Sequence, residues 1–247
     1  MRLCQDIRKI KMKRYKVILS YDGSKFYGFE KQKNVRTVQK EIEDALTELL
    51  DETILIKGAG RTDKGVHALN QVIHFDTDKK VWLLKYKLNR VLKDIHINKI
   101  KKVNNDFHAR FSVDRKIYFY KIKLNSKERS PYYYSLKKYD LDKMYEASKL
   151  FVGNHDYRNF VGGNPKMSTS LIDSITFKRK KDYLYIEFIG THFYQYMVRN
   201  IVNAIIYVGQ DKISLDDVKR MLAEPNHKKM LTPASPNGLY LKKITYK

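Results

Sequence analysis

Cysteine is almost absent from this 247-residue chain, which contains only Cys4. A single cysteine excludes an intrachain disulfide and a zinc site built from several thiolates, and it favours a reducing, cytoplasmic location. No run of about 20 apolar residues occurs, so we predict no membrane span. The basic segment before residue 14 also lacks the apolar core of a secretory signal.

Acidic residues are scarce as well: 27 Asp and Glu stand against 50 Lys and Arg, for a formal net charge of +23. Such an excess causes self-repulsion and is not needed for folding. It therefore predicts a polyanionic partner, with nucleic acid first and an anionic membrane surface second. Part of the lysine content also fits a biased genome or a heat-adapted proteome. The 43% hydrophobic content predicts a globular protein.

The hydrophobic pattern divides the chain into two parts of the same element order. Residues 1–11 are expected to form a flexible extension. In residues 12–113, alternation predicts strands at 14–21, 53–57, 71–75 and 97–103, and apolar stripes predict helices at 38–49 and 84–92. The resulting order β-α-β-β-α-β is ferredoxin-like.

Residues 114–247 repeat this order. We predict strands at 116–124, 171–178, 183–189 and 239–246, helices at 142–152 and 194–208, and a short helix capped by Ser214 with Asp217 three residues on. The predicted fold class is α+β. Two ferredoxin-like halves would share a largely antiparallel, mixed sheet with helices on one face and a nucleic-acid cleft between the halves.

The segment Gly58–Ala68, GAGRTDKGVHA, is the strongest candidate for chemistry. Its three glycines allow a partner to approach the backbone closely. Asp63 lies between Arg61 and Lys64, and nearby cations are expected to lower its pKa. An ionised carboxylate in a cleft can act as a nucleophile or a base. A plain hairpin loop with a capping aspartate and solvated cations fits the same spacing.

GAGRTDKGVHA resembles the signature of the TruA family of tRNA pseudouridine synthases, with Lys64 where alanine is usual. Five further segments resemble family motifs in the family's order: YDGSKFYG (21–28), TVQ (37–39), FHARFS followed by YFY (107–120), MVRNIV (197–202), and PASPNGL (233–239). Phe29-Glu30 and Asn203 depart from the pattern, where the family has Trp-Gln and glycine.

The resemblance implies that Asp63 is the catalytic nucleophile, that Arg61 pairs with it and helps to expel the base, and that Tyr118 stacks on the target ring. An ordinary core tyrosine is the alternative for Tyr118. The resemblance also implies that Arg199 lies in the cleft near Asp63, for which a core ion pair is the alternative. The residues expected to bind RNA or substrate are Lys64, His67, Arg110, Arg199 and Tyr120. His67 and His74 lack a third clustered ligand, so no metal is expected.

The reaction implied is the isomerisation of uridine to pseudouridine at positions 38–40 of the tRNA anticodon arm. Because substrate and product contain the same atoms, no cofactor is expected. The expected partners are tRNA and a second copy of the chain. The same chemistry at other RNA positions, or a non-catalytic RNA-binding module, are the alternatives. Basic residues mixed with aromatics at 116–138, around 178–181 and at 228–229 suit RNA contact.

Overall fold

The computed structural model describes residues 12–163, 166–225 and 231–247. The predicted extension at 1–11 and the basic pair Lys228-Lys229 lie outside the described residues. None of the helices in the described ranges has the length and apolar content needed to cross a bilayer.

The N-terminal half has the predicted ferredoxin-like order. Its elements are β1 (Lys13–Tyr21), α1 (Val38–Leu50), β2 (Lys57–Gly58), β3 (His67–Thr77), α2 (Leu84–Val91) and β4 (Ile95–Val103). The strands lie in the order β4-β1-β3, with β2 paired to β3 and every pair antiparallel. Side chains on one face of β1 are buried and those on the other are not, as the alternation predicted.

The predicted strand at 53–57 is wrong except at its end, where Lys57–Gly58 pairs with β3. The backbone N–H of Ile54 donates to Thr47 Oγ1 at 3.1 Å, and that of Ile56 donates to Glu43 Oε1 at 3.2 Å. Side chains of α1 therefore take the donors that a strand neighbour would have used, and the segment runs along the helix instead.

The C-terminal half repeats the arrangement with insertions. Its elements are β5 (Val113–Leu124), β6 (Tyr134–Leu136), α3 (Leu141–Lys149), β7 (Gly153–Asp156), β8 (Thr169–Lys180), β9 (Tyr183–Gly190), α4 (Met197–Gly209), α5 (Leu215–Ala223) and β10 (Leu239–Tyr246). The strand order is β10-β5-β9-β8-β7. The predicted capping box of Ser214 and Asp217 at the start of α5 is confirmed. Helix α4 begins three residues later than predicted because Tyr196 has a left-handed backbone with φ of 61°.

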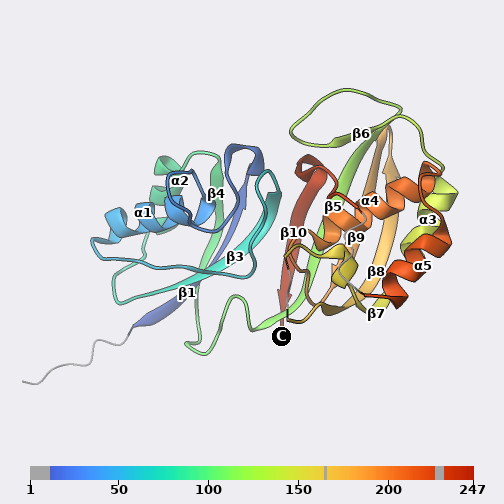
Figure 1. The fold of residues 1–247 in the computed structure, drawn as a ribbon. Helices are drawn as coiled ribbons and strands as arrows, with labels where there is room; N and C mark the ends of the chain where they lie inside the picture. The colour runs from blue at the N-terminus through green and yellow to red at the C-terminus, as the bar shows by residue number, and fades with distance from the viewer. Residues whose placement is uncertain (1–11, 164–165, 226–230) are drawn as a thin grey trace, which may run out of the picture.

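The two halves join through β3 and β10, which pair in parallel at Tyr240 with His67 and Leu241 with Ala68. This junction produces one ten-stranded sheet, in which β3–β10 and β5–β6 are parallel and the other pairs antiparallel. Figure 1 shows β10 beside β3 near the middle of the molecule, with α4 crossing in front of the C-terminal strands. The predicted mixed α+β fold is confirmed, and the division at 113/114 stays a prediction.

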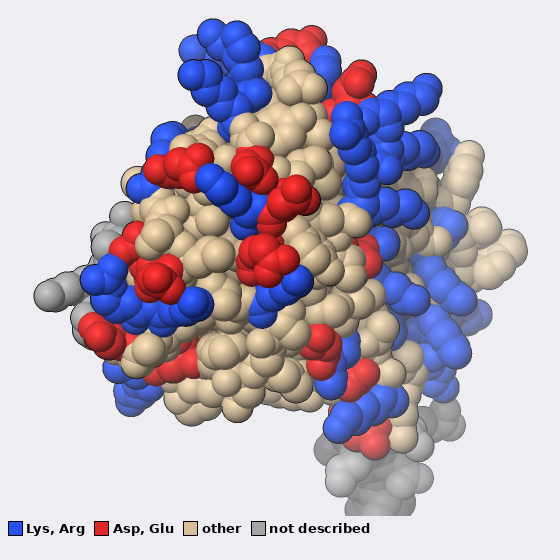
Figure 2. All heavy atoms as spheres, turned by 90° about the vertical axis from the view of Figure 1, so that its right-hand side faces the viewer, with Lys and Arg blue, Asp and Glu red and all other residues tan. Residues whose placement is uncertain are grey.

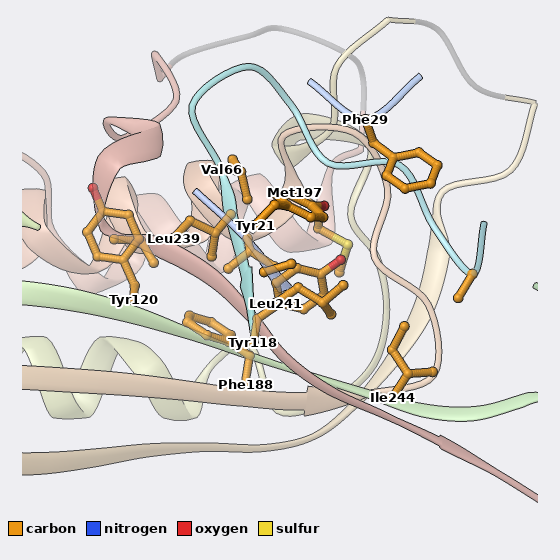
Figure 3. Packing of buried hydrophobic residues seen from close by; sticks show 14 of the residues in the cluster. Tyr21, Phe29, Val66, Tyr118, Tyr120, Phe188, Met197, Leu239, Leu241 and Ile244 are labelled. Carbon is orange, nitrogen blue, oxygen red and sulfur yellow. The ribbon is translucent and has the colours of Figure 1, made fainter. Parts of the chain in front are cut away.

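Buried apolar side chains continue across the junction. Figure 3 shows Tyr21 and Val66 of the N-terminal half near Tyr118, Leu241 and Met197 of the C-terminal half, all of which belong to one core cluster. Burial of apolar area at about 25 cal/mol per Å² favours keeping these surfaces together. The start of α4 is thereby held near the loop that connects β2 to β3, and this loop carries Asp63.

Candidate active site

The loop between β2 and β3 is fixed by backbone and buried side-chain contacts. The N–H of Ala59 donates to Val72 O at 2.8 Å, and the N–H of Phe29 donates to Thr62 O at 3.0 Å. The Tyr21 hydroxyl lies 2.8 Å from Thr62 Oγ1 in a buried position. Gly28 has φ of +98°, and a Cβ there would lie 2.9 Å from Thr62 O. The glycine is needed because the segment before α1 packs directly on the backbone of the Asp63 loop.

Asp63 pairs with an arginine of the other half of the molecule. Its Oδ2 lies 3.2 Å from Nη1 of Arg199, and the two side chains are 22% and 12% exposed. Arg199 lies in the first turn of α4, and its Nε donates to Ala234 O at 2.7 Å. The second hydrogen bond fixes the guanidinium, so it presents a defined donor to the carboxylate.

Burial raises the pKa of Asp63 above its ordinary value, while the charge and hydrogen bond of Arg199 act in the opposite direction. The sequence had indicated a pKa lowered by Arg61 and Lys64, and that direction is wrong. Both cations turn away from the carboxylate. Arg61 Nη1 lies 2.8 Å from Glu30 Oε2 in an exposed pair, and Lys64 Nζ lies 3.8 Å from the centre of the Tyr27 ring.

Tyr118 lies beside this pair on β5. Its side chain is 7% exposed, and its ring meets Phe193 edge-on with 5.2 Å between centroids. Burial, together with the neighbouring Tyr21 and Asp63, raises the pKa of the hydroxyl, which stays protonated at neutral pH. The ring is buried in the free protein and also forms part of the wall around Asp63, and its stacking on a target base stays a prediction.

A cavity of about 970 Å³ opens around Asp63 and Tyr118. Its walls come from both halves: the segment 27–30, the loop 60–64, residues of β5, and 192–199 at the start of α4. Six Lys and Arg side chains line it, against Glu30 and Asp63 as the two carboxylates. Because both carboxylates are already paired with arginine, the walls carry a net positive charge suited to an anionic ligand.

Comparison with known proteins agrees with this geometry. The family model of tRNA pseudouridine synthases matches residues 17–112 and 147–247. The tRNA pseudouridine synthase A of Listeria monocytogenes is 40% identical over 95% of this chain and 100% of its own length. The enzyme of the same name from Dictyoglomus thermophilum is 39% identical over 94% of this chain and 99% of its own length. That of Streptococcus uberis is 36% identical over 95% of this chain and 99% of its own length. The chain belongs to the tRNA pseudouridine synthase family.

A solved structure of a dye-decolorizing protein from V. cholerae gives a TM-score of 0.20 at 11% identity, covering 82% of this chain and 88% of that one. A likeness this low supports no structural argument. The family assignment therefore depends on sequence similarity over nearly the full chain.

Two residues expected to bind RNA in this family member lie outside the cavity. His67 is 2% exposed; its Nδ1 accepts from Gly23 N–H at 3.1 Å, its Nε2 lies 2.8 Å from Pro131 O, and its ring stacks on Tyr240. Burial lowers its pKa, so it is neutral and locks the sheet junction. Tyr120 is completely buried, and its hydroxyl donates to Ser235 O at 2.8 Å. Both assignments are corrected to structural roles.

Replacing Tyr120 by phenylalanine tests this correction. The substitution keeps the ring in the core and removes the donor to Ser235 O, so we expect a loss of about 1 kcal/mol in the free energy of unfolding. Urea unfolding followed by circular dichroism measures it. An unchanged stability combined with a loss of RNA affinity would return Tyr120 to the binding site.

His74 has a backbone hydrogen-bond partner and, in the described part of the chain, belongs to no group of metal ligands. His74 Nδ1 accepts from Ala109 N–H at 3.0 Å, and burial lowers the pKa of His74 to about 4. Among the residues that the structure describes, no three His, Cys, Asp or Glu side chains are grouped so that they could hold a metal ion. His74 therefore positions the segment before β5, which contains Arg110.

Lys116, His192 and Phe193 are among the cavity residues that were not singled out from the sequence. Lys116 could have been found from the sequence. It lies two and four positions before Tyr118 and Tyr120 on β5, so its side chain faces the interior on the same side of the strand. An inward lysine on a strand is unusual. His192 and Phe193 lie in the loop between β9 and α4, where no periodicity indicates direction.

Proposed function

We propose that this chain converts uridine to pseudouridine at positions 38–40 of the tRNA anticodon arm, with Asp63 as the reacting carboxylate. The observation that carries the proposal is the pairing of Asp63 with Arg199 in a basic cavity beside Tyr118. The name of its relatives, tRNA pseudouridine synthase A, supplies the substrate class. The position in the anticodon arm is supported by the resemblance alone.

The reaction breaks the bond between N1 of uracil and C1′ of ribose and forms a bond from C1′ to C5. The proton on C5 is lost and N1 gains one, so the product is an isomer of the substrate. Attack of Asp63 on the ribose, attack on the base, or removal of a ribose proton would each require an ionised carboxylate against the nucleoside. Arg199 supports that ionised form by charge and hydrogen bonding.

A paired uridine must leave its helix before its glycosidic bond can be reached, at a cost of a few kcal/mol. Stacking on an aromatic ring returns about 1–3 kcal/mol per base, and Tyr118 offers that ring beside Asp63. Arg61 is the residue proposed to help expel the base, and its pair with the solvent-exposed Glu30 can be broken at little cost.

Positive charge outside the cavity supports a large anionic substrate. Figure 2 shows Lys and Arg gathered along its right-hand edge, the side turned away from the viewer in Figure 1. With a net charge of +23, binding should weaken steeply with salt. Lys64 and Arg110 line the cavity and are the proposed contacts to RNA. A homodimer in which one tRNA contacts both subunits, and a cytoplasmic location, stay predictions.

The decisive experiment incubates the purified protein with unmodified tRNA transcripts and maps pseudouridine nucleotide by nucleotide. We expect product at positions 38–40. Product elsewhere would contradict the proposed positions and leave the chemistry intact. Absence of product from a folded protein that binds RNA would leave the alternative of a non-catalytic RNA-binding module.

Glu30 offers a smaller test at the cavity mouth. Glu30→Gln removes one negative charge from the wall and frees Arg61, so we expect KM for tRNA to fall by about two- to fivefold. The free energy of unfolding should change by less than about 1 kcal/mol, since the pair is exposed. Steady-state kinetics at two salt concentrations measure the effect, which should shrink at the higher one. A raised KM would show that the pair positions Arg61 for binding.

A further inference from the structure

The side chain of Lys116 is largely buried, and its ammonium group faces the cavity without an ion-pair partner in the described chain. The residue lies on β5, is 6% exposed, and faces the same side of the strand as Tyr118. Of the residues that the structure describes, none accepts a hydrogen bond from its Nζ or forms an ion pair with it. By contrast, the buried Glu43 is paired with Lys31, and Asp63 with Arg199. A buried charge without a partner lowers stability, so its presence here requires another explanation.

The surroundings of Lys116 lack negative charge. It lines the cavity with Gly60, Arg110 and His192. Burial and the charge of Arg110 lower the pKa of Lys116 to about 8. Burial, Lys116 and Arg110 together lower the pKa of His192 to about 4, so the imidazole is neutral. The two carboxylates of the cavity are engaged by Arg61 and Arg199. This part of the wall therefore holds positive charge that nothing in the described chain compensates.

The backbone leaves room for the ammonium group. A Cβ on Gly60 would lie 2.9 Å from Lys116 Nζ, closer than side chains approach in folded proteins. Gly60 lies in the Asp63 loop, so the missing side chain places the ammonium directly against that loop. Residues two apart on a strand are separated by about 7 Å, which puts Lys116 one short step along β5 from the ring proposed to stack on the target base.

We propose that Lys116 and Arg110 bind a backbone phosphate flanking the target uridine. This assignment rests on the proposed function, because it takes Tyr118 as the position of the target base. A phosphate brings the negative charge and acceptor oxygens that this wall lacks, and hydrogen bonds between charged groups are about twice as strong as neutral ones. Binding would also give the largely buried ammonium group a counter-charge. The unfavourable free energy of this group in the free protein would therefore be offset when RNA binds.

The first test separates a binding role from a structural one. Lys116→Met keeps the length of the side chain and removes its charge. In the Asp63→Asn background, we expect affinity for unmodified tRNA to fall by about tenfold and the slope of log affinity against log salt to fall by about one. The melting temperature of the free protein should rise by roughly 2–4 °C, because an unpaired buried charge is lost. If Lys116 instead stabilises the fold, the melting temperature of Lys116→Met should fall.

Lys16→Met is the matched control. Lys16 is also a partly buried strand lysine whose pKa burial lowers, but it lies on β1 over the rings of Phe107 and Tyr246, outside the cavity. We expect its affinity for tRNA to stay within about twofold of the parent. An equal loss in both variants would show a general effect of net charge and overturn the assignment.

The second test identifies the phosphate. A single neutral methylphosphonate is placed on either side of the target uridine in an anticodon-arm RNA, and affinity is measured with Lys116 and with Lys116→Met. At one of the two places the methylphosphonate should weaken binding to the parent by about tenfold. It should weaken binding to Lys116→Met clearly less, because only Arg110 then contacts that phosphate, and a thermodynamic cycle detects the difference. Equal losses for both proteins at both places would overturn the proposal.

Failure of this inference is distinguishable from failure of the proposed function. If the wild-type chain forms pseudouridine and Lys116→Met keeps its affinity and salt slope, Lys116 binds no phosphate and the function stands. If the wild-type chain binds tRNA without forming product, the function fails. Raising the pH from 7 to 9 adds a second measurement. Binding of tRNA to the wild-type chain should weaken, because Lys116 has a pKa of about 8 and loses its charge above that pH. Binding to Lys116→Arg should not weaken, because the guanidinium stays charged.

Discussion

Asp63→Asn is expected to bind tRNA with nearly wild-type affinity and to form no pseudouridine, with turnover reduced at least about 1000-fold. The amide has the shape of the carboxylate and still offers an oxygen to Arg199, but it cannot ionise to act as a nucleophile or a base. Removal of a group that acts in the chemical step lowers kcat, whereas removal of uniform binding raises KM. Single-turnover reactions on saturated enzyme measure the step directly.

The control for this experiment is the binding curve of the same variant, measured by filter binding or anisotropy under the conditions of the assay. Matched affinity shows that the fold and the RNA groove are intact. A variant that keeps more than about one hundredth of wild-type turnover would remove Asp63 from the reaction. In that case the carboxylate would serve to hold Arg199 and connect the two halves of the molecule.

Elements of the fold could be predicted where the information is local. Alternation along residues 14–21 and 116–124 indicated strands with one buried face, and both are present as β1 and β5. Ser214 and Asp217 lie three residues apart, so their capping box depended on no distant contact. The strand at 53–57 failed because α1, earlier in the chain, supplies hydrogen-bond acceptors to Ile54 and Ile56. That competition between partners cannot be judged from the strand's own residues.

The loop of the site was predicted, and the resemblance implied that Arg199 lies near Asp63, but it also implied a pair between Arg61 and Asp63 that the structure does not have. Arg61 lies two positions from Asp63 in the sequence but pairs with Glu30, whereas the observed partner of Asp63 is 136 positions away in the chain. Alternation on β5 likewise gave Tyr118 and Tyr120 the same direction, but not what covers each position. Ser235 lies over Tyr120, while the cavity opens beside Tyr118. Residue type and parity therefore identify candidates, and tertiary contacts decide which of them reach the substrate.

Arg199→Gln should shift the pH dependence of the reaction toward higher pH. Burial raises the pKa of Asp63 and Arg199 opposes that rise, so loss of the guanidinium lets the pKa increase further. The carboxylate is ionised only above its pKa, and activity is therefore lost at a higher pH as the solution is acidified. At pH 7 we expect kcat/KM to fall by about 100-fold, since one partner of a largely buried pair is left without its counter-charge. A profile of kcat/KM from pH 5 to 9 measures both effects.

Arg199→Lys is the matched variant, because it keeps the positive charge and loses the planar guanidinium that bonds to both Asp63 and Ala234 O. Its acid limb should lie between those of the wild type and Arg199→Gln if charge governs the ionisation of Asp63. A lysine variant with the wild-type pH profile but a low kcat would show that Arg199 acts by orienting the carboxylate. An unshifted profile in Arg199→Gln would contradict the electrostatic role altogether, and the 3.2 Å contact would then serve only to attach α4 to the Asp63 loop.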